Sequence, residues 1–352
     1  MPPKAVLFCA SFVVAALASP LGCSGDHDRL AKEDTTSTGG TGGTGGDDDP
    51  TSSSSSGGTG GVGGIVEPPG PTTLTVVNGV VDRDAVRFCF DAYPDPLPGS
   101  LPWPGVEGLP YARGTAVDTF ETTVPQDDDV EVLVISGDLS ATGGQSCAAL
   151  VTAPPAGVDV FSVGILPATV FDEEKSLLLV AAGCHGGPGH THEQEESVCG
   201  PGYSETRPNP TIIAGFMSRL GDFDKVAMQF AQASAGLPPS AVKVRPGDVA
   251  SVSQMATPSW SFGAIAPFPP FDAYSRAMLL DVAQAQVELL PSNGPDPFET
   301  ASFTEAFGNS NLTLDDIQDG ASLTFVGVGA APSMGTGVWW NAFTIAVVDS
   351  DP

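Results

Sequence analysis

One segment of the chain concentrates side chains that could bind a metal ion. Between Cys184 and Cys199 the sequence holds three of the four histidines together with several glutamates. In an extended segment, His190 and His192 project to the same side of the backbone. Two imidazoles beside a carboxylate suit Zn²⁺ or Cu²⁺. The candidate metal ligands are therefore His185, His190, His192 and Glu193.

The same segment also fits a polar surface loop that is closed by a disulfide and holds no cofactor. His192 and Glu193 are not followed by a second histidine at position 196, so the spacing of helical zinc proteases is missing. Four cysteines of the body allow three pairings. We predict Cys89–Cys147 and Cys184–Cys199, because local pairing keeps each bridge near its own part of the fold. By loop entropy these contribute about 4 and about 3 kcal/mol.

Acidic and aromatic residues offer two further candidate sites. Aspartates at 127–129, at 222 and 224, and at 315–316 could bind calcium, but none of these groups carries the EF-hand loop pattern, so solvated turns are the simpler expectation. Trp103 and Tyr111 lie in a candidate binding loop, residues 97–114, where exposed aromatics could stack on a glycan or anchor an envelope protein. The alternative for these aromatics is ordinary packing between sheets.

The elements that position these residues are predicted to be β-strands. Apolar residues alternate with polar ones around 86–90, 130–134, 242–244 and 343–347, and glycine, proline and aspartate separate these runs. The 43 glycines and 33 prolines fit a turn-rich sandwich and oppose a helical bundle. Residues 275–290 have helical propensity, but we expect the end of this segment to be a strand.

An internal repeat supports two tandem antiparallel β-sandwich domains with an immunoglobulin-like arrangement. Three segments recur in the same order: 82–90 matches 222–230, 130–133 matches 287–290, and 176–183 matches 322–329. The opening strand 74–78 and the strand 179–183, which ends on Ala-Gly, resemble a bacterial domain of unknown function (4397 type). This resemblance implies tandem domains on an exported lipoprotein, and it carries no established activity or catalytic residues.

The N-terminus predicts export. An apolar run over residues 5–18 is too short to span a bilayer comfortably and is followed by Gly22-Cys23-Ser24, as in a lipoprotein signal, with Cys23 as the lipidated residue. Cleavage after Ala18 is the alternative and would release a soluble, secreted protein. The expected organisation is a signal peptide at 1–22, a disordered tether at 23–70, and β-sandwich domains at 71–205 and 206–352.

The net charge and the catalytic motifs that the sequence lacks limit the classes of function that we expect. The formal charge of −29 makes nucleic acid an unfavourable partner. The sequence lacks a nucleophile-elbow serine, a phosphate loop and a dinucleotide fingerprint. We therefore expect a non-enzymatic binding or structural protein, lipid-anchored in the cell envelope and, within it, in the outer membrane. A surface metal-binding protein is the first alternative and an unrecognised hydrolase is the weaker one.

Overall fold

The computed structural model describes residues 67–117, 120–171, 174–187, 190, 195–204, 206–247, 252–279, 284–292 and 294–352. Residues from Glu67 to Pro352 form one compact unit. The predictions for the signal peptide, Cys23, most of the tether, His192 and Glu193 lie outside the described residues. No helix in the described part of the chain is long and apolar enough to cross a membrane.

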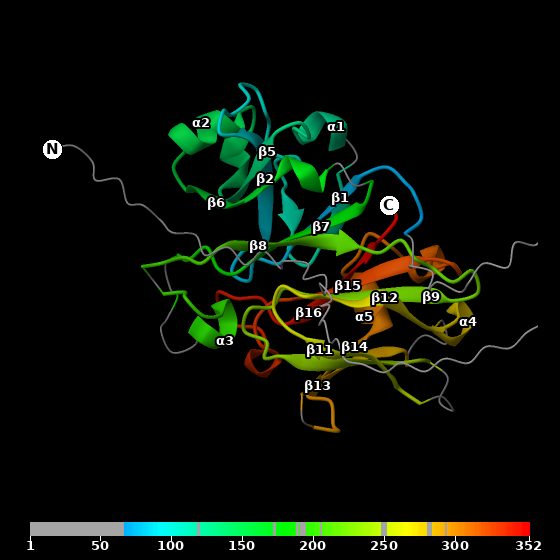
Figure 1. Ribbon diagram of the computed structural model, residues 1–352. Helices are drawn as coiled ribbons and strands as arrows, with labels where there is room; N and C mark the ends of the chain where they lie inside the picture. The colour runs from blue at the N-terminus through cyan, green and yellow to red at the C-terminus, as the bar shows by residue number, and fades with distance from the viewer. Residues whose placement is uncertain are drawn as a thin grey trace, which may run out of the picture. The chain divides into compact units, whose positions relative to one another are not determined.

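The first half of this unit forms two four-stranded sheets (Figure 1). The inner sheet has the order β4-β1-β7-β8, with β4 at Gly114–Ala116, β1 at Thr73–Asn78, β7 at Ser176–Ala182 and β8 at Thr211–Met217. The outer sheet has the order β3-β2-β5-β6, with β3 at Leu109–Pro110, β2 at Ala85–Tyr93, β5 at Asp129–Gly137 and β6 at Val158–Leu166.

The second half repeats this plan. Its inner sheet has the order β12-β9-β15-β16, with β12 at Ile265–Tyr274, β9 at Val226–Gln232, β15 at Ser322–Val328 and β16 at Thr344–Asp349. Its outer sheet has the order β11-β10-β13-β14, with β11 at Gln254–Trp260, β10 at Ser240–Arg245, β13 at Gln286–Pro291 and β14 at Glu299–Ser302. The α-helices are short: α1 (Phe120–Thr123), α2 (Cys147–Thr152), α3 (Glu195–Cys199), α4 (Arg276–Leu279) and α5 (Phe303–Gly308).

The predicted all-β sandwich class is confirmed, with one refinement. In each inner sheet the two central strands, β1 with β7 and β9 with β15, run parallel, and the other neighbouring strands run antiparallel. The segment 275–290 ends in strand β13, as expected, although the short helix α4 precedes it.

Three apolar layers hold the four sheets together. One layer fills the space between the two sheets of the first half, and a second does so in the second half. A third layer joins the two inner sheets, where Leu178 and Val180 of β7 pack in one cluster with Val326 and Val328 of β15. Each of these four side chains is fully buried. Strands β7 and β15 are therefore covered on both faces, which explains why they are continuous apolar runs without alternation.

The strand order tests the internal repeat match by match. Strands β5 and β13 hold equivalent places, and so do β7 and β15, which confirms two of the three matches. The first match is wrong: segment 82–90 contains β2, whereas 222–230 contains β9, which is the counterpart of β1. Most short strands show the same alternation of apolar and polar residues, so a similarity over nine residues cannot tell one strand from its neighbour.

Two equivalent glycines mark the duplication. Gly183 follows β7 with φ +83°, and Gly329 follows β15 with φ +103°, a region that favours glycine. A Cβ at either position would lie 2.3 Å from a carbonyl oxygen, that of Asn209 or of Ala342. The chain therefore leaves both central strands through the same tight turn, and the loops that follow are equivalent.

The changeover between the halves lies at residues 218–225. Strand β8 comes after the expected boundary at 205–206 and completes the inner sheet of the first half. Arg219, whose side chain is 3% exposed, holds this changeover in place. It donates to Ser176 Oγ (3.0 Å) and to the carbonyls of Glu174 (2.7 Å) and Pro71, and it pairs with Asp351 (3.0 Å).

We expect Arg219→Ala to lower the free energy of unfolding by about 2–3 kcal/mol, because it removes the hydrogen bonds of a buried guanidinium to Ser176, Glu174 and Pro71. Urea unfolding followed by circular dichroism measures this. Lys225→Ala is the control, since the Lys225 ammonium interacts with aspartates at the surface, Asp222 first, and its loss should leave the midpoint unchanged. Equal midpoints for both variants would contradict this role for Arg219.

Candidate functional site

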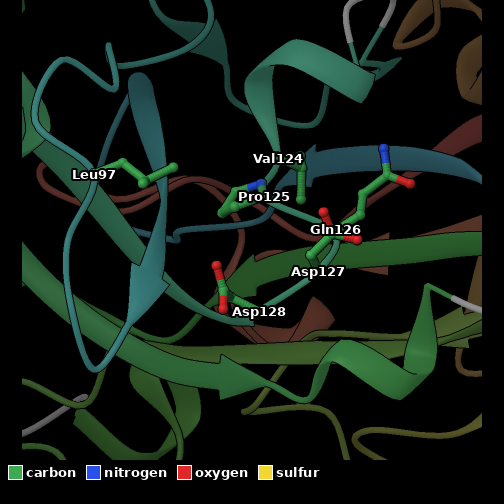
Figure 2. Close-up of a pocket in the computed structure, with 6 residues that line it drawn as sticks. All are labelled: Leu97, Val124, Pro125, Gln126, Asp127 and Asp128. Atoms are coloured by element: carbon green, nitrogen blue, oxygen red, sulfur yellow. The ribbon is translucent and has the colours of Figure 1, made fainter.

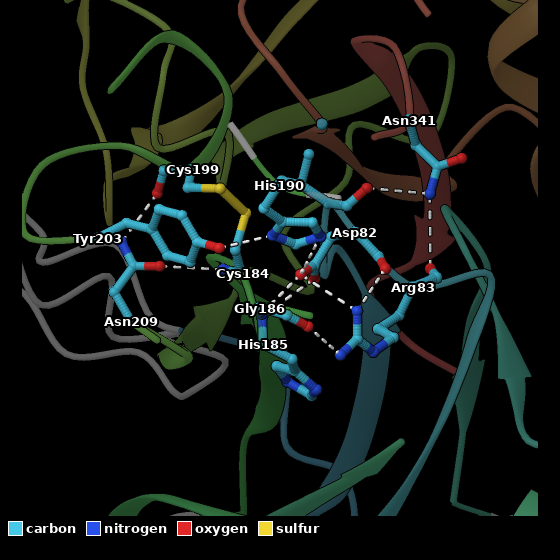
Figure 3. Close-up of a disulfide and its surroundings, with 12 residues drawn as sticks. Asp82, Arg83, Cys184, His185, Gly186, His190, Cys199, Tyr203, Asn209 and Asn341 are labelled. Atoms are coloured by element: carbon cyan, nitrogen blue, oxygen red, sulfur yellow. Dashed lines mark hydrogen bonds and ion pairs between the residues drawn. A yellow bond between two sulfur atoms is a disulfide. The ribbon is translucent and has the colours of Figure 1, made fainter. Parts of the chain in front are cut away.

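The two loops that follow the equivalent glycines contact each other through His190 and Trp339. Figure 3 shows the first of these loops beside Asn341 of the second. The disulfide loop, from Cys184 to Cys199, follows β7, and its two cysteines are bonded as predicted. The tryptophan loop, residues 330–343, follows β15. The backbone N–H of Ala331 donates to the carbonyl of Ser197 (2.8 Å), so the two loops also share a main-chain hydrogen bond.

The carboxylate of Asp82 is the centre of this cluster. Its side chain is fully buried and accepts the backbone N–H groups of His185 (3.0 Å) and Gly186 (2.7 Å). Arg83 Nη1 lies 3.2 Å from one carboxylate oxygen, and His190 Nε2 lies 3.6 Å from it. Burial raises the pKa of Asp82 above its usual value of 3.8, and Arg83 and the two N–H groups oppose this rise. The carboxylate thus joins the start of β2 to the disulfide loop.

His190 connects that carboxylate to the second half. Its ring stacks on Trp339, with 3.9 Å between ring centroids and 20° between the planes. Its Nδ1 is hydrogen-bonded to the hydroxyl of Tyr203. Asn341, from the same loop as Trp339, donates to the carbonyl of Val81 (3.1 Å). The histidine that the sequence singled out therefore lies in a packed junction between the two halves.

His185 points away from this junction into the first half. Its Nδ1 lies 2.8 Å from Ser136 Oγ, which also accepts a hydrogen bond from Arg83 Nε (3.2 Å). Its ring packs on Phe161 at 4.5 Å between centroids. Nε2 of His185 is buried, and no described group bonds to it. Burial and the positive charge of Arg83 hold the pKa of His185 well below 6.5, so the imidazole is neutral.

This arrangement does not bring His185 and His190 together as two ligands of one ion. Each ring has a nitrogen hydrogen-bonded to a protein hydroxyl and a face packed on an aromatic ring. Within the residues that the structure describes, no group of three His, Cys, Asp or Glu side chains is placed to hold a metal. The geometry instead makes both histidines structural. His185 packs within the first half. His190 belongs to the junction between the halves, which we call the latch and which also contains Asp82, Arg83, Trp339 and Asn341.

The neutral, buried His185 predicts a pH dependence of stability. The unfolded chain binds a proton at this imidazole near pH 6.5 and the folded chain does not, so the free energy of unfolding falls as the pH falls below 6.5. The slope is at most about 1.4 kcal/mol per pH unit. Asp82 acts in the opposite sense: its raised pKa lets the folded chain keep a proton more tightly, so its contribution declines as the pH rises above 3.8.

Comparison of variants isolates the imidazole. His185→Gln should flatten the dependence of the unfolding free energy on pH between pH 5 and pH 7. Ser136→Ala removes the hydrogen bond to His185 but keeps the titrating ring, so it should retain the wild-type slope. Urea unfolding at several pH values measures both, and an unchanged slope in His185→Gln would refute the assignment.

The second candidate region is the apolar loop, residues 93–106, which contains most of the loop predicted at 97–114. Asp91 Oδ1 accepts the N–H of Leu97 (2.8 Å) and the hydroxyl of Ser100 (3.2 Å). The guanidinium of the buried Arg87 donates to the carbonyls of Pro102 and Pro104. The main chain of Trp103 pairs with that of Phe88. The predicted disulfide Cys89–Cys147 is confirmed and connects β2 to helix α2. At the start of α2 the backbone N–H of Cys147 donates to the Ser100 carbonyl (2.9 Å). The loop is therefore fixed along its length.

This rigid loop exposes apolar side chains. Tyr93, Leu97, Leu101 and Val106 are 45%, 46%, 63% and 40% exposed. Neither predicted aromatic is among them. Trp103, within this loop, packs partly buried on Phe88. The Tyr111 hydroxyl donates to the Ala342 carbonyl (2.8 Å) of the second half. Burial raises the pKa of Tyr111 far above its usual value. The exposed aliphatic residues beside Trp103 carried no sequence signal.

A hollow of about 500 Å³ lies beside this loop (Figure 2). Leu97 lines it together with Val124, Pro125, Gln126, Asp127 and Asp128. Asp127 and Asp128 are exposed, and Asp129 lies outside the hollow and accepts the N–H of Ala168 (3.0 Å). The three aspartates thus do not converge on one point.

Sequence reasoning missed Asp82, Arg83, Trp339 and Asn341 as members of the latch. The Asp-x-Asp repeat did draw attention to Asp82, but as a local turn. That description fits Asp222, which pairs with Lys225 three residues later (3.4 Å). No protein-family model and no curated protein matches this chain, so its resemblance to the domain of unknown function stays an expectation.

Proposed function

We propose that the protein is an exported, lipid-tethered component of the cell envelope with a non-enzymatic binding role. The lipoprotein-like signal around Cys23 and the Gly-, Ser- and Thr-rich tether support attachment and reach. Two disulfides with fully buried cysteines support an oxidising compartment. The role of the folded unit is then to present a fixed surface at a distance from the membrane.

The observation that carries the binding role is the apolar loop. Leu97 and Leu101 are exposed, so burying them against a partner would remove apolar surface from water and favour binding. The loop that carries them is held rigid by Arg87, Asp91 and a disulfide. A preorganised loop loses little conformational entropy when it binds, which is how rigid contact loops gain affinity. Leu97, Leu101 and Val106 are aliphatic and favour a protein partner, and Tyr93 adds an exposed aromatic ring to the same surface.

A photo-crosslinking amino acid at position 101, used in cells that express the full chain, tests this role. We expect crosslinked products at position 101 that disappear when Leu97→Ser is added. The matched control places the crosslinker at Val338, which lies on the tryptophan loop and is more exposed than Leu101 (101% against 63%). Equal products from both positions, or none from position 101, would count against the loop as a contact surface.

Mass spectrometry of the mature protein tests the anchor separately. The proposal expects an N-terminal Cys23 that carries acyl chains, and a Cys23→Ser variant that leaves the membrane fraction. A mature N-terminus at Ser19 without lipid would replace the anchored protein with a secreted one. That outcome would leave the contact surface to be judged by crosslinking alone.

A further inference from the structure

The strands at the edges of the four sheets differ in whether their outward-facing backbone N–H and C=O groups are blocked from pairing with another strand. Strand β12 carries a bulge in which residues 267–270, three of them prolines, stand opposite the single residue Gln229. Strand β11 contains Pro258, and β3, β4 and β14 are only two to four residues long. Prolines, bulges and short length are the usual means of blocking strand addition.

Two longer edges are blocked in other ways. On β16, Asn309 and Ser310 donate side-chain hydrogen bonds to the carbonyls of Ile345 (3.4 Å) and Val347 (2.6 Å). On β6, a bulge at Val163 interrupts the ladder with β5, and Asp159 places a charge on the strand. Each of these edges therefore has a feature that opposes a new strand.

Strand β8 has none of these features. Its seven residues, Thr211–Met217, contain no proline and no charged residue, and they pair with β7 without a bulge. Among the described residues, no hydrogen bond joins the β8 backbone to any group outside β7. One side of β8 therefore presents a row of N–H and C=O groups that an extended chain can pair with.

The side chains of β8 suit an added strand as well. Ile213 and Met217 are buried in the layer between the inner sheets, and Phe216 packs on the core of the first half. Ala214 is exposed and small. The strand is thus fixed in position by its own burial, and Ala214 presents a small side chain at the surface.

The surroundings of β8 favour a single extended segment over a second copy of the protein. Strand β8 contacts β6 and β12, the edges of the two adjacent sheets (Figure 1). Two copies with a formal charge of −29 each repel one another, whereas a segment with basic residues is attracted.

We propose that β8 accepts an extended segment of a partner protein, apolar in the centre and flanked by Lys or Arg, as a fifth strand of the inner sheet. The main-chain ladder supplies affinity, and the acidic body selects basic flanks. This site is separate from the apolar loop, so its failure would leave the proposed function untouched.

Hydrogen exchange of the full chain tests the proposal with a defined peptide, Lys-Lys-Val-Thr-Val-Thr-Val-Lys-Lys. We expect its addition to slow amide exchange in residues 211–217 about tenfold. A backbone N-methylated form of the peptide cannot complete the ladder and should have no effect. A peptide with glutamates in place of the lysines should bind more weakly.

Charge variants at the exposed position of β8 provide the second readout. Ala214→Lys should lower the affinity for the basic peptide about fivefold, and Ala214→Asp should raise this affinity by a similar factor. The reason is that charges on neighbouring strands interact by up to about 1 kcal/mol. Met255→Lys on the proline-containing strand β11 is the control and should change nothing. Three results would overturn the proposal: no slowing at 211–217, equal slowing by the N-methylated peptide, or slowing that rises with protein concentration alone.

Discussion

Val326→Asp is expected to unfold the whole body or to lower its free energy of unfolding by about 4 kcal/mol or more. Val326 is fully buried in the layer between the two inner sheets, where Leu178, Val180 and Val328 surround it with apolar groups. A carboxylate there loses its hydration and gains no partner, which is among the most destabilising single changes. Total stabilities of natural proteins are about 5–15 kcal/mol, so few domains tolerate this loss.

The same substitution at an exposed valine is the matched control. Val338→Asp adds the same charge to a fully exposed position and should leave the unfolding midpoint unchanged. Because the layer between the inner sheets belongs to both halves, we expect one urea transition in the wild-type protein. Circular dichroism and tryptophan fluorescence should report it at the same midpoint. A Val326→Asp variant in which the first half keeps its wild-type midpoint would contradict this coupling.

Asp82→Ala should be the most destabilising change in the latch, at about 3–5 kcal/mol. It leaves the N–H groups of His185 and Gly186 without an acceptor and removes the buried counter-charge beside Arg83 and His190. The loss of stability comes from leaving these buried N–H groups and side chains without a partner, rather than from the Coulomb energy of the ion pair itself. Asp82→Asn keeps one acceptor oxygen and should fall between the wild type and Asp82→Ala.

An aspartate in the same local pattern, although not at an equivalent place in the fold, supplies the control for this experiment. Asp222 stands in the same Asp-x-Asp pattern as Asp82 but is solvent-exposed and pairs with Lys225. Asp222→Ala should therefore leave the unfolding midpoint unchanged. Urea unfolding of the three variants side by side measures the effect. Equal effects at Asp82 and Asp222 would show that the aspartate acts only as a turn residue in both places.

Several features of the fold follow from local sequence patterns. Alternating runs identified β2, β5, β10 and β16, and the turn-forming residues between them indicated a sandwich. The cysteine spacing indicated both disulfides correctly. These predictions succeeded because strand periodicity and short loop closure depend on residues that are close together in the chain.

The chain by itself determined that the body is all-β, duplicated and disulfide-bonded, because those properties are written in composition, periodicity and spacing. Only the tertiary structure decided which strands correspond and where Asp82, His185 and His190 act. Asp82 and Trp339 lie far apart in the chain, yet both contact His190. Such contacts depend on how whole sheets stack, and stacking is set by the summed burial of both faces of β7 and β15 rather than by any local pattern.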